Sequence, residues 1–180
     1  MAIFFTSDHH FGHTNVIQYS QRPFKDLAHM HETLIERWNS VVHSQDEVYH
    51  LGDLFLCSQE EALRIRARLN GRIYLVLGNH DKTAASLPHL FEWAKEMYYL
   101  RHEKHRVVLC HYAMRVWRNS SHGSWHLHGH SHGALSPIGY SMDVGVDCWD
   151  YTPISWDEIR REMTQRGPGL EQYHHARRTE

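Results

Sequence analysis

The sequence feature that most constrains the fold is an apolar run, Ile73–Leu77, followed directly by Gly78-Asn79-His80-Asp81. The run is rich in β-branched and aromatic residues, so it predicts a buried strand. Open α/β sheets place their chemistry at the carboxyl ends of strands, where these four residues would lie. Asn79 offers an amide oxygen to a cation, His80 can transfer a proton, and Asp81 can fix the tautomer of His80. The alternative interpretation is an ordinary turn between a strand and a helix.

Four other segments follow a predicted strand with the same kinds of side chain, which favours one built site over separate turns. They supply Asp8 and His10 after 2–7, Asp53 after 47–51, His111 after 107–110, and His130 and His132 after 125–127. Residues two apart in an extended segment point the same way, so we expect Asp8 and His10 to reach one cation together. The same alternation would place His128, His130 and His132 on one side. We expect Asp53 to approach two cations, one with each carboxylate oxygen.

Helical patterns lie between the predicted strands. Apolar spacings of three and four predict a helix from Leu27 to Val41 with Asp26 as its N-cap. Ser58 and Ser155 each precede a glutamate by three residues, which is a capping box, so a helix should begin after each serine. A short helix is also predicted over 90–97, and a further strand over 140–146. We find no internal repeat or linker, so we predict one domain over 1–166 and a flexible tail over 167–180.

Composition excludes several classes of protein. The 180 residues suit a single domain, and 41% are hydrophobic, which is enough for a sizeable core. The formal net charge of −2 leaves no polybasic field that would demand nucleic acid. Three cysteines without a CxxC pair favour a reduced, cytoplasmic setting over a disulfide framework. The apolar start is too short for a signal peptide or a membrane span.

The candidate ligands outnumber what one tetrahedral cation needs, and they fit two cations that share one carboxylate. Imidazole and oxygen ligands together select first-row metals, with Mn favoured and Fe, Zn, Co or Ni as alternatives. Two such ions about 3.5–4 Å apart are a common device for in-line displacement at phosphorus. The chain also holds 19 histidines, and several of them stand at strand ends beside Asp, Gly and Asn. A metal-storage or sensing protein would not need the Gly78-Asn79-His80-Asp81 arrangement.

The ordered set of these motifs resembles that of the calcineurin-like metallophosphoesterases. The resemblance runs from Asp8 to His132, and the segment Val144–Asp147 is also similar to small bacterial and phage members. It implies a four-layer α-β-β-α sandwich, in which two mixed sheets lie face to face with helices outside. It also implies two metal ions, one held by Asp8, His10, Asp53 and His132, and the other by Asp53, Asn79, His111 and His130.

The resemblance implies a hydrolase that breaks phosphoesters by in-line attack of a metal-bridging hydroxide. His80 would protonate the leaving group and Asp81 would orient His80. Small members without large cap domains tend towards diesters or nucleotides, so a small phosphodiester or nucleotide is the favoured substrate. A phosphomonoesterase is the first alternative, and a non-catalytic binding module of the same fold is the second. Arg115 follows His111 closely and is a candidate for holding the substrate phosphate, as is Arg118.

Overall fold

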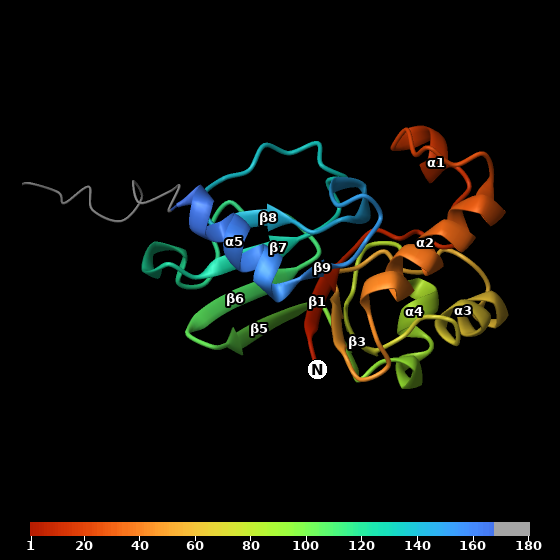
Figure 1. The fold of residues 1–180 in the computed structure, drawn as a ribbon, viewed down its shortest axis with the longest axis horizontal. Coiled ribbons are helices and arrows are strands. Elements are labelled where there is room, and N and C mark those ends of the chain that lie inside the picture. Colours follow the sequence, from red (N-terminus) through yellow and green to blue (C-terminus); the bar gives the residue numbers. More distant parts are fainter. Residues whose placement is uncertain (168–180) are drawn as a thin grey trace, which may run out of the picture.

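Nine strands form two mixed sheets in the computed structural model, which describes residues 1–167 (Figure 1). The first sheet has the order β4 (Trp93–Lys95), β3 (Arg72–Val76), β2 (Glu47–His50), β1 (Ile3–Thr6), β9 (Ile154–Ser155). The second has the order β5 (Met97–His102), β6 (His105–Cys110), β7 (Trp125–His128), β8 (Ser141–Asp143). Only β9 in the first sheet and β5 in the second run antiparallel to their neighbours. The predicted α/β fold of two mixed sheets flanked by helices is confirmed.

Three of the five α-helices in residues 1–167 begin where the sequence places their caps. The five are α1 (Val16–Tyr19), α2 (Leu27–Val41), α3 (Gln59–Arg66), α4 (Lys82–Ala85) and α5 (Trp156–Arg166). The side chains of Asp26, Ser58 and Ser155, the N-caps of α2, α3 and α5, each accept a hydrogen bond from the backbone N–H three residues later. Each cap satisfies a donor that the first turn of its helix leaves without an intrahelical partner.

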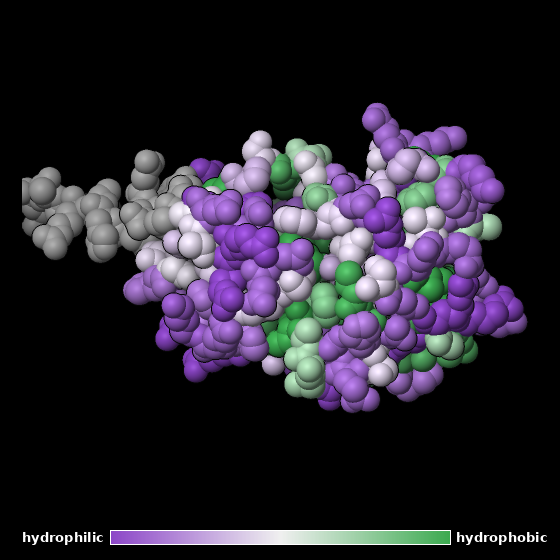
Figure 2. Space-filling view, in the orientation of Figure 1, coloured by the Kyte–Doolittle hydropathy of each residue, from purple (hydrophilic) through white to green (hydrophobic). Residues whose placement is uncertain are grey.

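Adjacent residues of β1 and β2 point into two different cores, because successive strand side chains face opposite sides of a sheet. Phe4 and Val48 pack with the apolar faces of α2 and α3 in one core. Phe5 and Tyr49 pack in the other core with residues of the second sheet and of α5. In Figure 1, α2, α3 and α4 accordingly lie on one side of the first sheet, and the second sheet lies on the other. Figure 2 shows a mostly hydrophilic surface on this face, with apolar residues gathered near its centre.

The prediction of a helix over 90–97 is wrong. A 3-10 turn over Pro88–Leu90 is followed by β4 and then directly by β5. Residues Trp93–Lys95 pair in parallel with β3, so the open edge of the sheet outweighs a weak helical spacing. The ammonium group of Lys95 then lies over the rings of Trp93 and Tyr98, at 4.9 and 5.0 Å. The strand predicted over 140–146 is also shorter, and residues 168–180 of the predicted tail lie outside the described residues.

The topology brings the carboxyl ends of the parallel strands to one place between the two sheets. The segments that leave β1 and β2 remain hydrogen bonded to each other, since Asp8 N–H donates to Gly52 O and His10 N–H donates to Asp53 O, both at 2.9 Å. Gly129 N–H donates to His111 O at 3.0 Å and joins the ends of β6 and β7 in the same way. No helix in residues 1–167 has the length and apolar character that crossing a membrane requires.

Candidate metal centre

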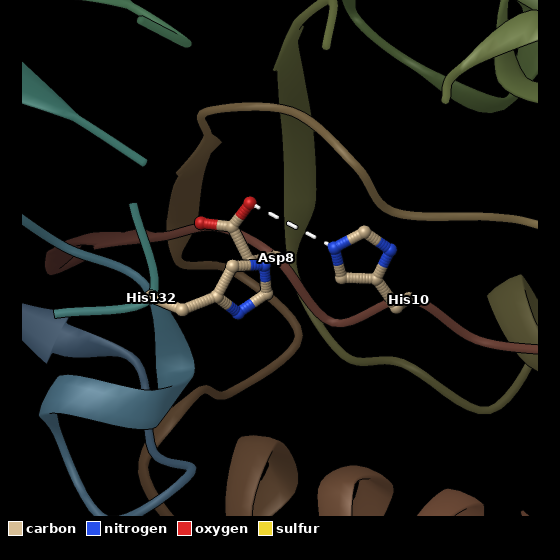
Figure 3. A group of neighbouring side chains, drawn as sticks. All are labelled: Asp8, His10 and His132. Carbon is tan, nitrogen blue, oxygen red and sulfur yellow. Dashed lines mark ion pairs between the residues drawn. The ribbon is translucent and has the colours of Figure 1, made fainter. Parts of the chain in front are cut away.

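Six of the predicted ligands form two groups of three that are each compact enough to hold one metal ion. Asp8, His10 and His132 form the first group, and Asp53, His111 and His130 form the second. Within each group the candidate ligand atoms lie within 4.8 Å of one another. Figure 3 shows the first group, in which the imidazole rings of His10 and His132 lie beside the carboxylate of Asp8. Residues from β-strand ends more than 120 positions apart in the chain therefore meet in one site.

Asp53 lies between the two groups. Its Oδ2 atom is 3.6 Å from His10 Nε2 and 3.5 Å from His111 Nε2. Its Oδ1 atom accepts a hydrogen bond from the backbone N–H of His80 at 2.8 Å. The prediction of one carboxylate oxygen for each cation is not met, because the same oxygen, Oδ2, faces a histidine of each group. A carboxylate placed in this way can join two cations into one centre.

His111 and Asn79 face each other in a way that suits a cation. The Nδ1 atom of His111 lies 2.8 Å from Leu51 O, and a carbonyl only accepts, so Nδ1 carries the proton in the neutral ring. The lone pair on Nε2 then points at Asn79 Oδ1, 3.1 Å away, in the present orientation of the amide. Two acceptors at this separation are unfavourable alone and favourable around a shared cation. Asn79 thus lies beside the second group.

Five of the seven predicted ligands have left-handed backbone conformations. The φ angles are 60° at Asp8, 53° at His10, 58° at Asp53, 66° at His130 and 47° at His132. The predicted extended conformation of these segments is therefore wrong, although Asp8 and His10 do converge. His128 remains in β7, buried and outside both groups. Non-glycine residues in this region carry strain, and such strain concentrates at functional sites.

Burial makes the charged forms of Asp8 and His10 in the first group unfavourable. Desolvation raises the pKa of the Asp8 carboxyl to about 8 and lowers the pKa of the His10 imidazole to about 2. Neither ring nitrogen of His10 has a hydrogen-bond partner among residues 1–167, although both are buried. A divalent cation would satisfy the imidazole and offset the buried carboxylates, so the residues present fit the metal ions that the motifs imply.

Sequence reasoning missed two residues that support the first group, Arg22 and Asp147. The Oδ2 atom of Asp147 lies 2.6 Å from Nδ1 of His132, which turns Nε2 of that ring towards Asp8. Arg22 is buried and holds Asp147 with two hydrogen bonds of 2.8 Å. It also donates to the carbonyl oxygens of Asp8 and His9. Burial opposes ionisation of Asp147, but the bonds from His132 and Arg22 hold its pKa below the usual range.

The two residues predicted for catalysis lie in different surroundings. The His80 ring is half-buried, and its centroid is 5.5 Å from that of His10. Asp81, in contrast, accepts from the backbone N–H groups of Asp53, Leu54 and Gly78 at 2.7–2.9 Å. Both oxygens of Asp81 are therefore engaged with the backbone, and it ties the ligand loops together instead of orienting the His80 ring as predicted.

The predicted substrate residues lie on the loop between β6 and β7. Arg115 and Arg118 are exposed there, whereas Trp117 is buried and donates its indole N–H to Ser124 O. Two cavities flank this loop where it leaves the centre. One of about 530 Å³ is lined by Asn79 and Tyr112, and another of about 350 Å³ is lined by Met114 and Gly133. There is thus space beside the ligands for organic groups.

The fold and the paired His/Asp groups define a two-sheet α/β protein with a candidate dinuclear centre. The model of the calcineurin-like phosphoesterase superfamily domain matches residues 1–143. The chain belongs to this family, which supports a hydrolase that acts on phosphoesters. The predicted family membership is confirmed.

Two relatives and one solved structure are similar to this chain over most of its length. The uncharacterized protein MJ1445 of Methanocaldococcus jannaschii is 33% identical over 166 residues, which cover 87% of this chain and 88% of that protein. The Gene 66 protein of Mycobacterium phage L5 is 30% identical over 193 residues, with 86% and 90% covered. The crystal structure of AQ665, a protein of unknown function from Aquifex aeolicus, has a TM-score of 0.73 and 28% identity, with 89% and 98% covered.

Proposed function

We propose that this protein is a dinuclear metal-dependent phosphodiesterase. The observation that carries the proposal is the position of Asp53, whose Oδ2 atom lies within 3.6 Å of a histidine from each group. Mn²⁺ is the favoured ion, because mixed imidazole and oxygen ligands suit first-row metals. The bound ions would polarise the phosphoryl oxygens and lower the pKa of a water molecule that attacks phosphorus.

The chain's own residues then have separate tasks. Asp53 and the two groups would hold the ions that bind the phosphate, and His80 donates a proton to the leaving oxygen. His80 suits this task because it lies beside the first group and its backbone is fixed by the bond to Asp53. Asp81 holds the loop that carries Asn79 and the loop that carries Asp53 close to each other. Arg115, exposed on the loop that follows His111, is the proposed contact for a phosphate oxygen.

The two cavities favour a diester over a monoester. A diester carries two organic arms, and the segment from Tyr112 to Met114 has a cavity on either side. The larger cavity combines the exposed ring of Tyr112 with apolar walls from Leu77 and Met97, which suits a flat base or sugar. A small nucleotide-type diester is therefore the proposed substrate.

Hydrolysis of bis(p-nitrophenyl) phosphate and of its monoester tests this proposal. The protein would be stripped with a chelator and reloaded with Mn²⁺, and Asp53→Asn and His80→Gln would be measured beside the wild type. We expect diester turnover that needs metal and is abolished in Asp53→Asn. In His80→Gln we expect kcat to fall by about 10²–10⁴, because general acid catalysis contributes that much. Turnover of the monoester alone would support the phosphatase alternative and contradict the proposal.

A further inference from the structure

Three arginines line one small hollow on the outer face of the second sheet, away from the metal centre. Arg101 and Arg106 stand directly opposite each other on β5 and β6. Arg118 comes from the loop between β6 and β7, and its guanidinium carbon lies 5.0 Å from the ring centroid of Tyr99. The hollow has a volume of about 60 Å³, and its lining contains no carboxylate. We call the hollow lined by these three residues the arginine hollow.

The charges of the arginine hollow are not compensated within residues 1–167. No ion pair in this part of the chain involves Arg101, Arg106 or Arg118, whereas other arginines such as Arg64 and Arg68 pair with glutamates. Like charges directly opposite each other on a sheet destabilise the pair. The arrangement therefore has a cost in the free protein, and a bound anion would remove that cost.

We propose that the arginine hollow binds a backbone phosphate of a single-stranded nucleic acid. Guanidinium groups bind phosphate with paired hydrogen bonds, and the exposed ring of Tyr99 beside them offers a face on which a base can stack. Arg106 and His111 are five positions apart along β6 and its end, which is roughly 17 Å at about 3.3 Å per residue. The hollow is therefore a second phosphate site, distinct from the metal centre and too far from it to hold the same phosphate group.

The test measures binding and needs no turnover, so its failure is distinguishable from failure of the proposed hydrolysis. The metal-loaded full-length protein would be titrated into a fluorescein-labelled 20-nucleotide phosphorothioate DNA, which resists cleavage, and followed by anisotropy at several salt concentrations. The variant is the double substitution Arg101→Ala with Arg106→Ala. Its control is Lys25→Ala with Arg161→Ala, two exposed cations elsewhere that give the same change in net charge.

The double variant is expected to bind the DNA at least tenfold more weakly at low salt. The slope of log affinity against log salt should become shallower by about 0.7, because the arginine hollow neutralises one phosphate and each neutralised phosphate of a single strand contributes about 0.7. Its unfolding midpoint should not fall, since a like-charge pair has been removed. An equal loss in the control would overturn the proposal, as would a wild type that binds pyrophosphate but no DNA. As a second check, Arg106→Glu should weaken DNA binding while raising the unfolding midpoint.

Discussion

At the residue scale, the candidate centre depends on the groups that hold the ligands as much as on the ligands themselves. Asp147 orients His132, Leu51 fixes the proton of His111, and Asp81 fixes the loops of Asn79 and Asp53. Such partners set the ring orientation and the basicity of a metal-binding histidine. Asp81 stands in a strand-end motif, but none of the three roles follows from such a motif, because each depends on a contact with a distant part of the chain.

Replacing Asp147 should weaken one metal position and spare the other. In Asp147→Asn we expect affinity for the ion of the first group to fall about 10–100-fold, because His132 loses the partner that orients it. The second group makes no contact with Asp147 and should keep its ion. Isothermal titration with Mn²⁺ would resolve the two positions.

The control for Asp147→Asn is Asp150→Asn, which breaks an exposed ion pair with Arg37 and should leave both positions unchanged. Because Arg22 would lose its buried partner, unfolding should be measured in parallel, to show that the variant is folded at the titration temperature. Equal weakening of both positions would contradict a role confined to His132.

At the scale of elements, the loops after the strands decide the geometry of the centre. The sequence predicted most of the strands, the caps of α2, α3 and α5, and the residues that gather at the strand ends. It did not predict how they gather, because the left-handed conformations of Asp8, His10 and Asp53 are stabilised by hydrogen bonds between loops. It also failed over 90–97, where pairing with β3 outweighed local spacing. Arg22 and Asp147 are 125 positions apart, and no local pattern could have joined them.

The close approach of two loops predicts different effects for two glycine substitutions. Gly52 and Gly123 both have positive φ, 99° and 76°, so alanine is strained by about 1–2 kcal/mol at either position. At Gly52 the added Cβ would also lie 2.5 Å from Nδ1 of His111, whereas at Gly123 nothing lies within 4 Å. We expect both variants to lower the unfolding midpoint, and Gly52→Ala to lower it more.

The metal content of the two variants distinguishes the effect of backbone strain from the effect of the clash with His111. Gly123→Ala should bind the same number of ions as the wild type, and Gly52→Ala should lose the ion of the second group. Differential scanning calorimetry with metal analysis of both proteins would measure this. If the two variants lose equal stability and keep equal metal, then Gly52 is required for its backbone conformation alone.

At the scale of the whole molecule, an almost neutral chain carries local charges of opposite kinds. Buried carboxylates gather at the metal centre, and uncompensated arginines gather on the outer face of the second sheet. The net charge of −2 conceals both, since each set comes from separate segments of the chain. Several imidazoles are also buried, and their protonation makes the stability of the whole molecule depend on pH.

Acid should destabilise the molecule, in part through His126. Burial lowers the pKa of His126 in the folded protein to about 4, below its unfolded value of 6.5. The unfolded state therefore binds the proton first, so this contribution is complete above pH 6.5 and is lost as the pH falls towards 4. The loss is up to roughly 3 kcal/mol, at about 1.4 kcal/mol per pKa unit. His126→Gln should show a shallower fall in unfolding free energy between pH 6.5 and 4.5.

Denaturant unfolding at a series of pH values, with a chelator present throughout, would exclude metal release from this comparison. The exposed His122→Gln is the matched control and should follow the wild type. A pH profile of His126→Gln that coincides with the wild type would show that His126 has an ordinary pKa in the folded protein.

The most direct test of the account is the number of metal ions that the chain binds. Full-length protein reloaded with Mn²⁺ and dialysed would be analysed by inductively coupled plasma mass spectrometry, beside Asp53→Asn. The account predicts two ions per chain in the wild type and fewer in the variant, because Asp53 faces both groups. A single ion in the wild type, or two ions retained at unchanged affinity in Asp53→Asn, would contradict a centre joined by this carboxylate.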